Sequence, residues 1–170
     1  PVSVYGRTKL EGDQALLASG CNPIILRVSW VYGMRGSNFL LTMRRLMRER
    51  GALNIVDDQV GAPTWCRTIA QVTAAVLAKL PDSPDARRAL SGVYHLAPGG
   101  STSWFGFAAA IRERLGLQCD LHPIPAADYP TPAARPANSR MDTSKLNNTF
   151  GLTMPSWQQD LARCLDGQKD

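Results

Sequence analysis

The alternation of buried strands with amphipathic helices is the feature that most constrains how this chain can fold. Residues 23–28 form a run of apolar and β-branched side chains, which is typical of a strand buried on both faces of a parallel sheet. A helical pattern follows at 38–50, then a short strand at 53–56 and another helix at 68–80. Because parallel strands are joined by crossovers that are usually helical, this order predicts an α/β architecture.

The rest of the chain continues this pattern. The other predicted elements are an opening helix at 5–19, a polar linker at 81–89, a strand at 92–96, a helix at 104–115, one short strand at 122–124 within a proline-rich stretch, and two helices at 142–150 and 156–165.

The opening helix carries a tyrosine and a lysine four residues apart, Tyr5 and Lys9. Side chains at this spacing lie on one helix face, so a phenol and an ammonium can point into one pocket. A nearby cation favours the ionised form of a phenol, which suits a tyrosine that exchanges protons. The same spacing also fits an exposed helix face without chemistry, so the pair alone leaves both interpretations open.

Composition excludes several classes of function. The net charge of +5 depends partly on a basic run at 44–50, which we interpret as a solvated helix face; no nucleic-acid partner is expected. No apolar stretch is long enough to span a membrane. The four cysteines lack metal-ligand spacing and predict free thiols in a reducing cytoplasm. The start at Pro1, close to the Tyr5 helix, suggests that an N-terminal portion lies outside this sequence.

A set of short blocks resembles the dTDP-4-dehydrorhamnose reductases, which are extended short-chain dehydrogenases/reductases. Each block alone is unremarkable, but together they follow the family's order over nearly the whole chain. The blocks lie at 5–12, 26–33, 36–39, 56–64, 92–95, 103–104, 134–139, and 150–151 with 155–157.

The resemblance implies that the chain is the C-terminal part of a Rossmann-like fold with a small substrate-binding α/β subdomain. Residues 1–60 would then complete the Rossmann-like core and carry the tyrosine-lysine helix. Residues 61–170 would mostly form the sugar-nucleotide binding part, with elements interleaved with the core.

The same resemblance implies reduction of dTDP-4-dehydro-L-rhamnose to dTDP-L-rhamnose by NADPH or NADH. Tyr5 would donate the proton to the carbonyl oxygen, and Lys9 would assist it and bind the nicotinamide ribose. The family's glycine-rich pyrophosphate loop and the Ser/Thr partner of the tyrosine do not occur in these residues. We therefore expect the chain by itself to be inactive.

Five further residues are candidates for binding the sugar nucleotide. Trp30 follows a buried strand, and in the family this tryptophan packs on the sugar; a core or lid aromatic is the alternative. Asn38 and Phe39 open a helix whose free N–H groups suit a diphosphate. Arg135 is either a phosphate contact or a clamp on its proline-rich loop. Gln59 is a weaker candidate.

Other assignments remain open. Some relatives carry a magnesium-binding glutamate where this chain has Arg67, so no magnesium is expected. Another sugar-nucleotide epimerase or dehydratase, or a non-catalytic regulatory subunit on the same fold, is the alternative to the reductase. A dTDP-sugar is the expected partner, and an oligomer is possible.

Overall fold

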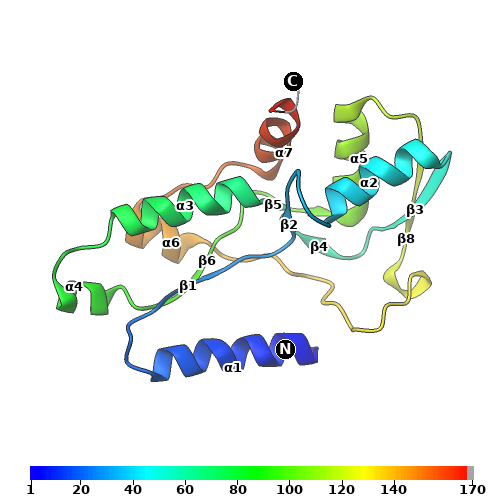
Figure 1. The fold of residues 1–170 in the computed structure, drawn as a ribbon. Helices are drawn as coiled ribbons and strands as arrows, with labels where there is room; N and C mark the ends of the chain where they lie inside the picture. Colours follow the sequence, from blue (N-terminus) through cyan, green and yellow to red (C-terminus); the bar gives the residue numbers. More distant parts are fainter. Residues whose placement is uncertain (168–170) are drawn as a thin grey trace.

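The computed structural model describes residues 1–167, arranged as alternating helices and strands (Figure 1). The last residues of the predicted second part, 168–170, lie outside the described residues. The helices are α1 (Val4–Ala18), α2 (Phe39–Glu49), α3 (Cys66–Ala78), α4 (Pro84–Ala89), α5 (Trp104–Leu115), α6 (Ser144–Phe150), α7 (Trp157–Asp166) and the short 3₁₀ helix η1 (Ala126–Asp128). The strands are β1 (Ile24–Arg27), β2 (Val31–Tyr32), β3 (Ala52–Val56), β4 (Val60–Gly61), β5 (Thr64–Trp65), β6 (Gly92–His95), β7 (Thr102–Ser103) and β8 (Asp120–Ile124).

The strands pair in twos, and three of the four pairs are parallel. β1 pairs with β6, β2 with β5 and β3 with β8, while β4 and β7 are antiparallel. In the β1–β6 register Ile25 lies beside Val93, and in β3–β8 Leu53 lies beside Leu121. The predicted α/β class with parallel pairing is confirmed.

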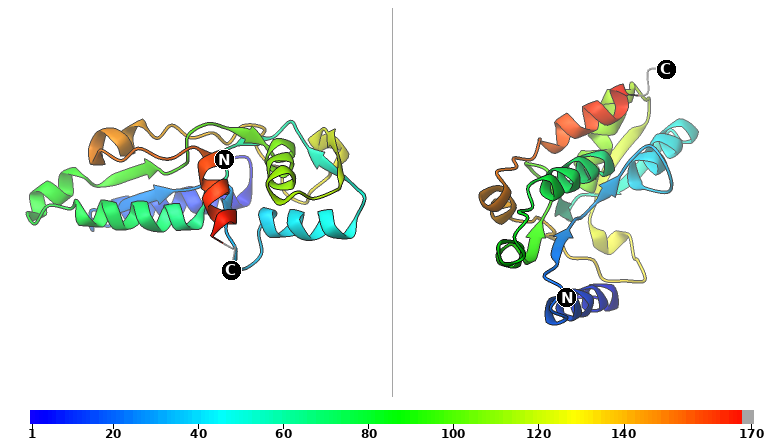
Figure 2. Two further views of the ribbon diagram at one scale, coloured as in Figure 1. Left: turned by 90° about the horizontal axis from the view of Figure 1, so that it is seen from above. Right: turned by 60° about the vertical axis from the view of Figure 1, so that its left-hand side comes forward.

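Two hydrophobic cores hold these pairs against the helices. The first lies among α2, α5, α7 and β3, where Leu40, Phe107 and Ile111 are completely buried. The second joins α3, β6 and α6 through Val76, Tyr94 and Leu146. In the left view of Figure 2, helices α2 and α5 of the first core lie at one end of the molecule, and helices α3 and α6 of the second core lie toward the other end.

Helix α1 stands apart from both cores. None of its residues is buried, and it lies on the side of β1 opposite to α3 (Figures 1 and 2). The Asp13 carboxylate connects it to β1 by accepting an ion-paired hydrogen bond from Arg27, with Nη2 at 2.6 Å. Several of its large apolar and aromatic side chains are exposed to solvent: Val4, Tyr5, Leu16 and Leu17.

The two-residue strands β2, β4, β5 and β7 were not predicted, and two longer segments differ from the sequence-based expectation. The prediction of a linker at 81–89 is wrong in part, because α4 forms there: Pro84 suits the first helical turn, Asp85 lies near its positive end and Arg88 near its negative end. The strand expected at 122–124 begins two residues earlier, at Asp120. It includes Pro123, which is tolerated because β8 is an edge strand.

Candidate functional site

The Tyr5–Lys9 pair lies on the exposed face of α1. The helix begins at Val4 because the Ser3 hydroxyl accepts a hydrogen bond from the Gly6 backbone N–H at 3.1 Å. The Lys9 ammonium lies 5.7 Å from the centroid of the Tyr5 ring, and Tyr5 is 71% exposed. The two side chains are thus close to one another and accessible to a ligand.

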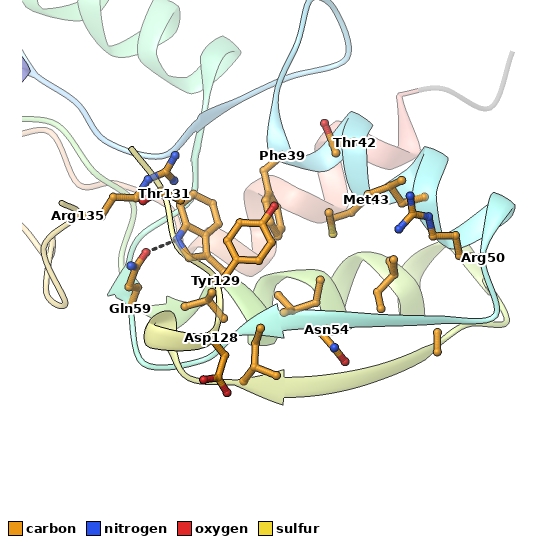
Figure 3. A pocket seen from close by; sticks show the side chains of 17 residues that line it. Phe39, Thr42, Met43, Arg50, Asn54, Gln59, Asp128, Tyr129, Thr131 and Arg135 are labelled. Atoms are coloured by element: carbon orange, nitrogen blue, oxygen red, sulfur yellow. Dashed lines mark hydrogen bonds between the residues drawn. The ribbon is translucent and has the colours of Figure 1, made fainter. Parts of the chain in front are cut away.

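A cavity of about 840 Å³ lies between α2, the β3–β8 pair and the segment after η1 (Figure 3). Three of the predicted residues line it: Phe39, Gln59 and Arg135. In Figure 3, Gln59 and Arg135 lie at one end of the cavity and Arg50 at the other. The other polar or aromatic lining residues include Thr42, Asn54, Trp104, Asp128, Tyr129 and Thr131.

Sequence reasoning did not propose Arg50, Trp104 or Tyr129 as site residues. Tyr129 lies in the stretch that was expected to be irregular, where no periodicity indicates which way a side chain points. Trp104 lies in one of the family-like blocks, and that block was the available signal. Pairing of β8 with β3, distant in sequence, brings the segment of Tyr129 over the cavity.

Trp30 has an unusual backbone and a close aromatic partner. Its φ is +48°, in the left-handed region that a bulky side chain rarely adopts. Its carbonyl accepts a hydrogen bond from the Thr64 N–H at 3.1 Å. Its indole stacks on that of Trp104, with centroids 3.5 Å apart and planes inclined by 3°. Trp104 lines the cavity, and Trp30 lies behind it, in contact with the Trp104 indole.

Gln59 and Phe39 hold Trp104 from the cavity side. The Trp104 indole N–H donates to Gln59 Oε1 at 3.2 Å, the dashed line in Figure 3. The Phe39 ring is tilted against Trp104 with centroids 4.7 Å apart. Gln59, Phe39 and Trp30 are thus joined in one cluster centred on Trp104.

Asn38 caps α2 rather than lining the cavity. Its Oδ1 accepts from the Leu41 N–H at 3.2 Å, and its Nδ2 donates to the Gly33 carbonyl at 2.9 Å. The side chain thereby fixes the entry of α2 and the orientation of Phe39. Arg135 is exposed, in the loop beside the cavity. The binding roles of both residues stay predictions.

A group of buried polar side chains lies away from the cavity, where β2 meets α7. Both carboxylate oxygens of Asp160 are buried without a hydrogen-bond partner among the described residues. Burial raises the pKa of the Asp160 carboxyl, although the Thr68 hydroxyl and Arg163 oppose the shift. Burial also raises the pKa of the Cys164 thiol to about 11. The pKa of the Tyr32 phenol is likewise raised well above its ordinary value, mainly by burial.

Over residues 1–167, no three His, Cys, Asp or Glu side chains converge as a metal site would require. The Arg67 guanidinium, at the position discussed above for magnesium, lies 5.2 Å from the Trp65 ring. Tyr5 and Lys9 present a hydroxyl and an ammonium to solvent, which suits the hydroxyl groups of a ribose. In the described part of the chain, no helix has the length and apolar character needed to cross a membrane.

Comparisons with known proteins agree with the sequence motifs. The dTDP-4-dehydrorhamnose reductase of Shigella flexneri is 41% identical over 172 residues, which cover 98% of this chain and 56% of that protein. The Bacillus anthracis dTDP-4-dehydrorhamnose reductase, solved in complex with NADP, superposes with a TM-score of 0.90 at 32% identity over 99% of this chain and 57% of that one. The UDP-glucuronic acid 4-epimerase of Bacillus cereus, with a TM-score of 0.72 at 20% identity over 98% of this chain and 52% of that one, shares the fold.

The chain thus spans little more than half the length of the curated relatives it matches. The sequence profile of the family described as "RmlD substrate binding domain" matches residues 1–169. The Rossmann-type architecture expected from the motifs is also that of the solved relatives, and the predicted resemblance is confirmed. The chain belongs to the RmlD substrate-binding domain family.

Proposed function

We propose that this chain supplies the proton donor and the sugar-nucleotide site of a dTDP-4-dehydrorhamnose reductase. The observation that carries the proposal is the Tyr5–Lys9 pair, exposed on one face of α1 in a chain of this family. The reaction is reduction of dTDP-4-dehydro-L-rhamnose to dTDP-L-rhamnose. The nicotinamide cofactor, NADPH or NADH, supplies the hydride that reaches the C4 carbonyl carbon.

In this mechanism Tyr5 donates its phenolic proton to the carbonyl oxygen while that oxygen gains negative charge. Lys9 lies beside the ring, where its ammonium stabilises the phenolate left after the transfer. With the cofactor bound, Lys9 would also donate hydrogen bonds to its ribose. Both roles require accessible side chains, which the exposure of Tyr5 supplies.

The cavity is suited to the dTDP part of the substrate. Phe39 and Tyr129 offer flat apolar surfaces for a thymine ring and deoxyribose. Arg135 can grip a phosphate with two parallel hydrogen bonds. Gln59 accepts from Trp104 and keeps its amide N–H₂ for the ligand. Trp30, stacked on Trp104, then packs on the sugar next to the dTDP part.

The proposal extends to how the chain is organised. Residues 1–60 would complete a Rossmann-like core, and residues 61–170 would mainly bind the substrate. The β1–β6 and β3–β8 pairs join strands from both sides of that boundary, which supports interleaving.

The four free cysteines support a reducing cytoplasm as the location. No magnesium and no nucleic acid take part in the proposed reaction, and an oligomer remains compatible with it.

The test is NADPH oxidation by the complete polypeptide that contains these residues, with the 4-keto sugar nucleotide as substrate. Tyr5→Phe removes the acidic proton without removing the ring, so we expect turnover to fall about 10²–10⁴-fold. Lys9→Met should also lower turnover. Arg7→Met is the matched control, because it removes a cation from an exposed position of the same helix. Unchanged turnover in Tyr5→Phe would refute the mechanism.

The 170 residues alone provide a second test. Because they contain no glycine-rich pyrophosphate loop, we propose that they do not oxidise NADPH by themselves. Turnover by the isolated chain, measured in the same assay, would contradict this proposal.

A further inference from the structure

We propose that Trp104 is a positioning residue of the substrate site: it holds the indole of Trp30 in the orientation in which Trp30 meets the sugar. The inference rests on the proposed function, since the contact between Trp30 and the sugar belongs to it. Trp104 acts through Trp30, and four observations support this role.

First, Trp30 depends on outside support. A bulky residue with φ at +48° is held in a sparsely populated backbone region, which persists only where the surroundings enforce it. The hydrogen bond from the Thr64 N–H to the Trp30 carbonyl fixes the backbone but leaves the side chain free to rotate. The parallel stack on Trp104, with 3.5 Å between centroids, fixes the plane of the indole.

Second, Trp104 is fixed independently of Trp30. It is the first residue of α5, whose cap Ser103 accepts from the Gly106 N–H at 2.9 Å and donates to the Asp57 carboxylate. Its indole N–H donates to Gln59. Trp104 can therefore serve as a rigid reference plane for its neighbour.

Third, the Trp30 indole is also confined by β4. A Cβ placed on Gly61 would lie 2.5 Å from Trp30 Cε2 and 2.7 Å from its Nε1. Only the missing side chain at Gly61 leaves room for the ring. Trp104 and Gly61 thus both restrict the Trp30 indole.

Fourth, Trp104 lies where the two parts of the proposed site meet. It stands at the wall of the cavity proposed for dTDP and stacks on Trp30, the tryptophan proposed to contact the sugar. Trp30 is only partly buried, so part of its indole remains available to a ligand. Trp104 therefore sets the geometry between the nucleotide end and the sugar end of one substrate.

A double-mutant cycle on the complete polypeptide tests the inference. Trp104→Leu keeps apolar volume but removes the flat surface, and Trp30→Leu does the same to its partner. We expect each variant to lower kcat/KM for the 4-keto sugar nucleotide about 10- to 100-fold, because small misplacements at a reacting centre have effects of this size. If Trp104 acts through Trp30, the double variant is within about twofold of Trp30→Leu. Losses that multiply would overturn the inference.

Two controls separate positioning from folding. Trp104→Phe restores a flat ring and should recover most of the lost kcat/KM. Phe105→Leu, a matched change at the next residue of α5 that packs against the first core, should leave kcat/KM within about twofold of the wild type. If Trp104→Phe is as impaired as Trp104→Leu, the stack is not what matters and the inference fails.

A measurement without substrate separates this inference from the proposed function. In the 170-residue chain labelled with 5-fluorotryptophan, each of the four tryptophans carries one ¹⁹F nucleus, and the Trp30 signal is assigned by its loss in Trp30→Leu. We expect Trp104→Leu to shift and broaden the Trp30 signal, and Phe105→Leu to leave it in place. An unmoved Trp30 signal would overturn the inference. A wild-type polypeptide that fails to oxidise NADPH, with the Trp30 signal still shifted by Trp104→Leu, would refute the proposed function while the coupling of the two indoles stands.

Discussion

Replacing Gly61 by alanine should both destabilise the chain and displace Trp30. Gly61 lies in β4, is buried, and has a φ outside the left-handed region, so alanine meets no backbone strain there. The added methyl group would lie 2.5 Å from the Trp30 ring and 2.6 Å from Ser139 Oγ, well inside contact distance. The Ser139 hydroxyl donates to the Val60 carbonyl, so neither neighbour can move without losing an interaction.

The magnitude follows from these contacts. Adding a methyl group to a tightly packed site typically costs about 1–3 kcal/mol, and loosening an aromatic stack costs about 0.5–1.5 kcal/mol. The two costs do not add in full, because the neighbouring side chains relax around the new methyl group. We therefore expect a loss of about 2 kcal/mol in the free energy of unfolding. For a chain of this length, that lowers the Tm by about 4–8 °C.

Thermal unfolding followed by circular dichroism measures the change. Gly51→Ala is the matched control, because a Cβ at Gly51 meets no atom within 4 Å. Its Tm should equal or slightly exceed that of the wild type, since alanine reduces the entropy of the unfolded chain. If Gly61→Ala unfolds within about 1 °C of Gly51→Ala, the close packing of Gly61 against Trp30 is refuted.

Three more predictions follow from buried and paired groups. Burial raises the pKa of the Asp160 carboxyl in the folded state above its unfolded value of ~3.9. The resulting contribution to stability is fully present below the unfolded pKa, and it is lost as the pH rises through the raised pKa of the folded state. Asp160→Asn should therefore have a higher Tm than the wild type at neutral pH, and the difference should shrink toward pH ~4; a constant difference would contradict the shift. Iodoacetamide at pH ~8 should label exposed Cys21 long before Cys164, which is 2% exposed with a thiol pKa of about 11; mass spectrometry showing equal labelling would disprove this. Asp13→Asn breaks the partly buried pair with Arg27, so α1 amide hydrogens of the 170-residue chain should exchange about two- to fivefold faster, and unchanged exchange would mean that other contacts hold α1.

Much of the fold could be predicted because its signals are local. The run at 24–26 is apolar throughout, and the apolar stripe of α2 repeats at helical spacing, so each of these elements can be recognised from a few residues. The short helix α4 was missed because a polar helix carries no apolar period; only Pro84 and the placement of its charges indicate it. The two-residue strands β2, β4, β5 and β7 are too short for any periodic signal.

The candidate site divides in the same way. The sequence alone determined that Tyr5 and Lys9 share a helix face, because a spacing of four residues fixes this in any α-helix. It also determined the α/β class and, through its ordered motifs, the family. Only the tertiary structure decided that Trp30 stacks on Trp104, 74 residues further along the chain, and that Gln59 bonds the same indole. Such contacts depend on how β4 pairs with β7 and β3 with β8, and pairing between distant strands leaves no local mark on either strand.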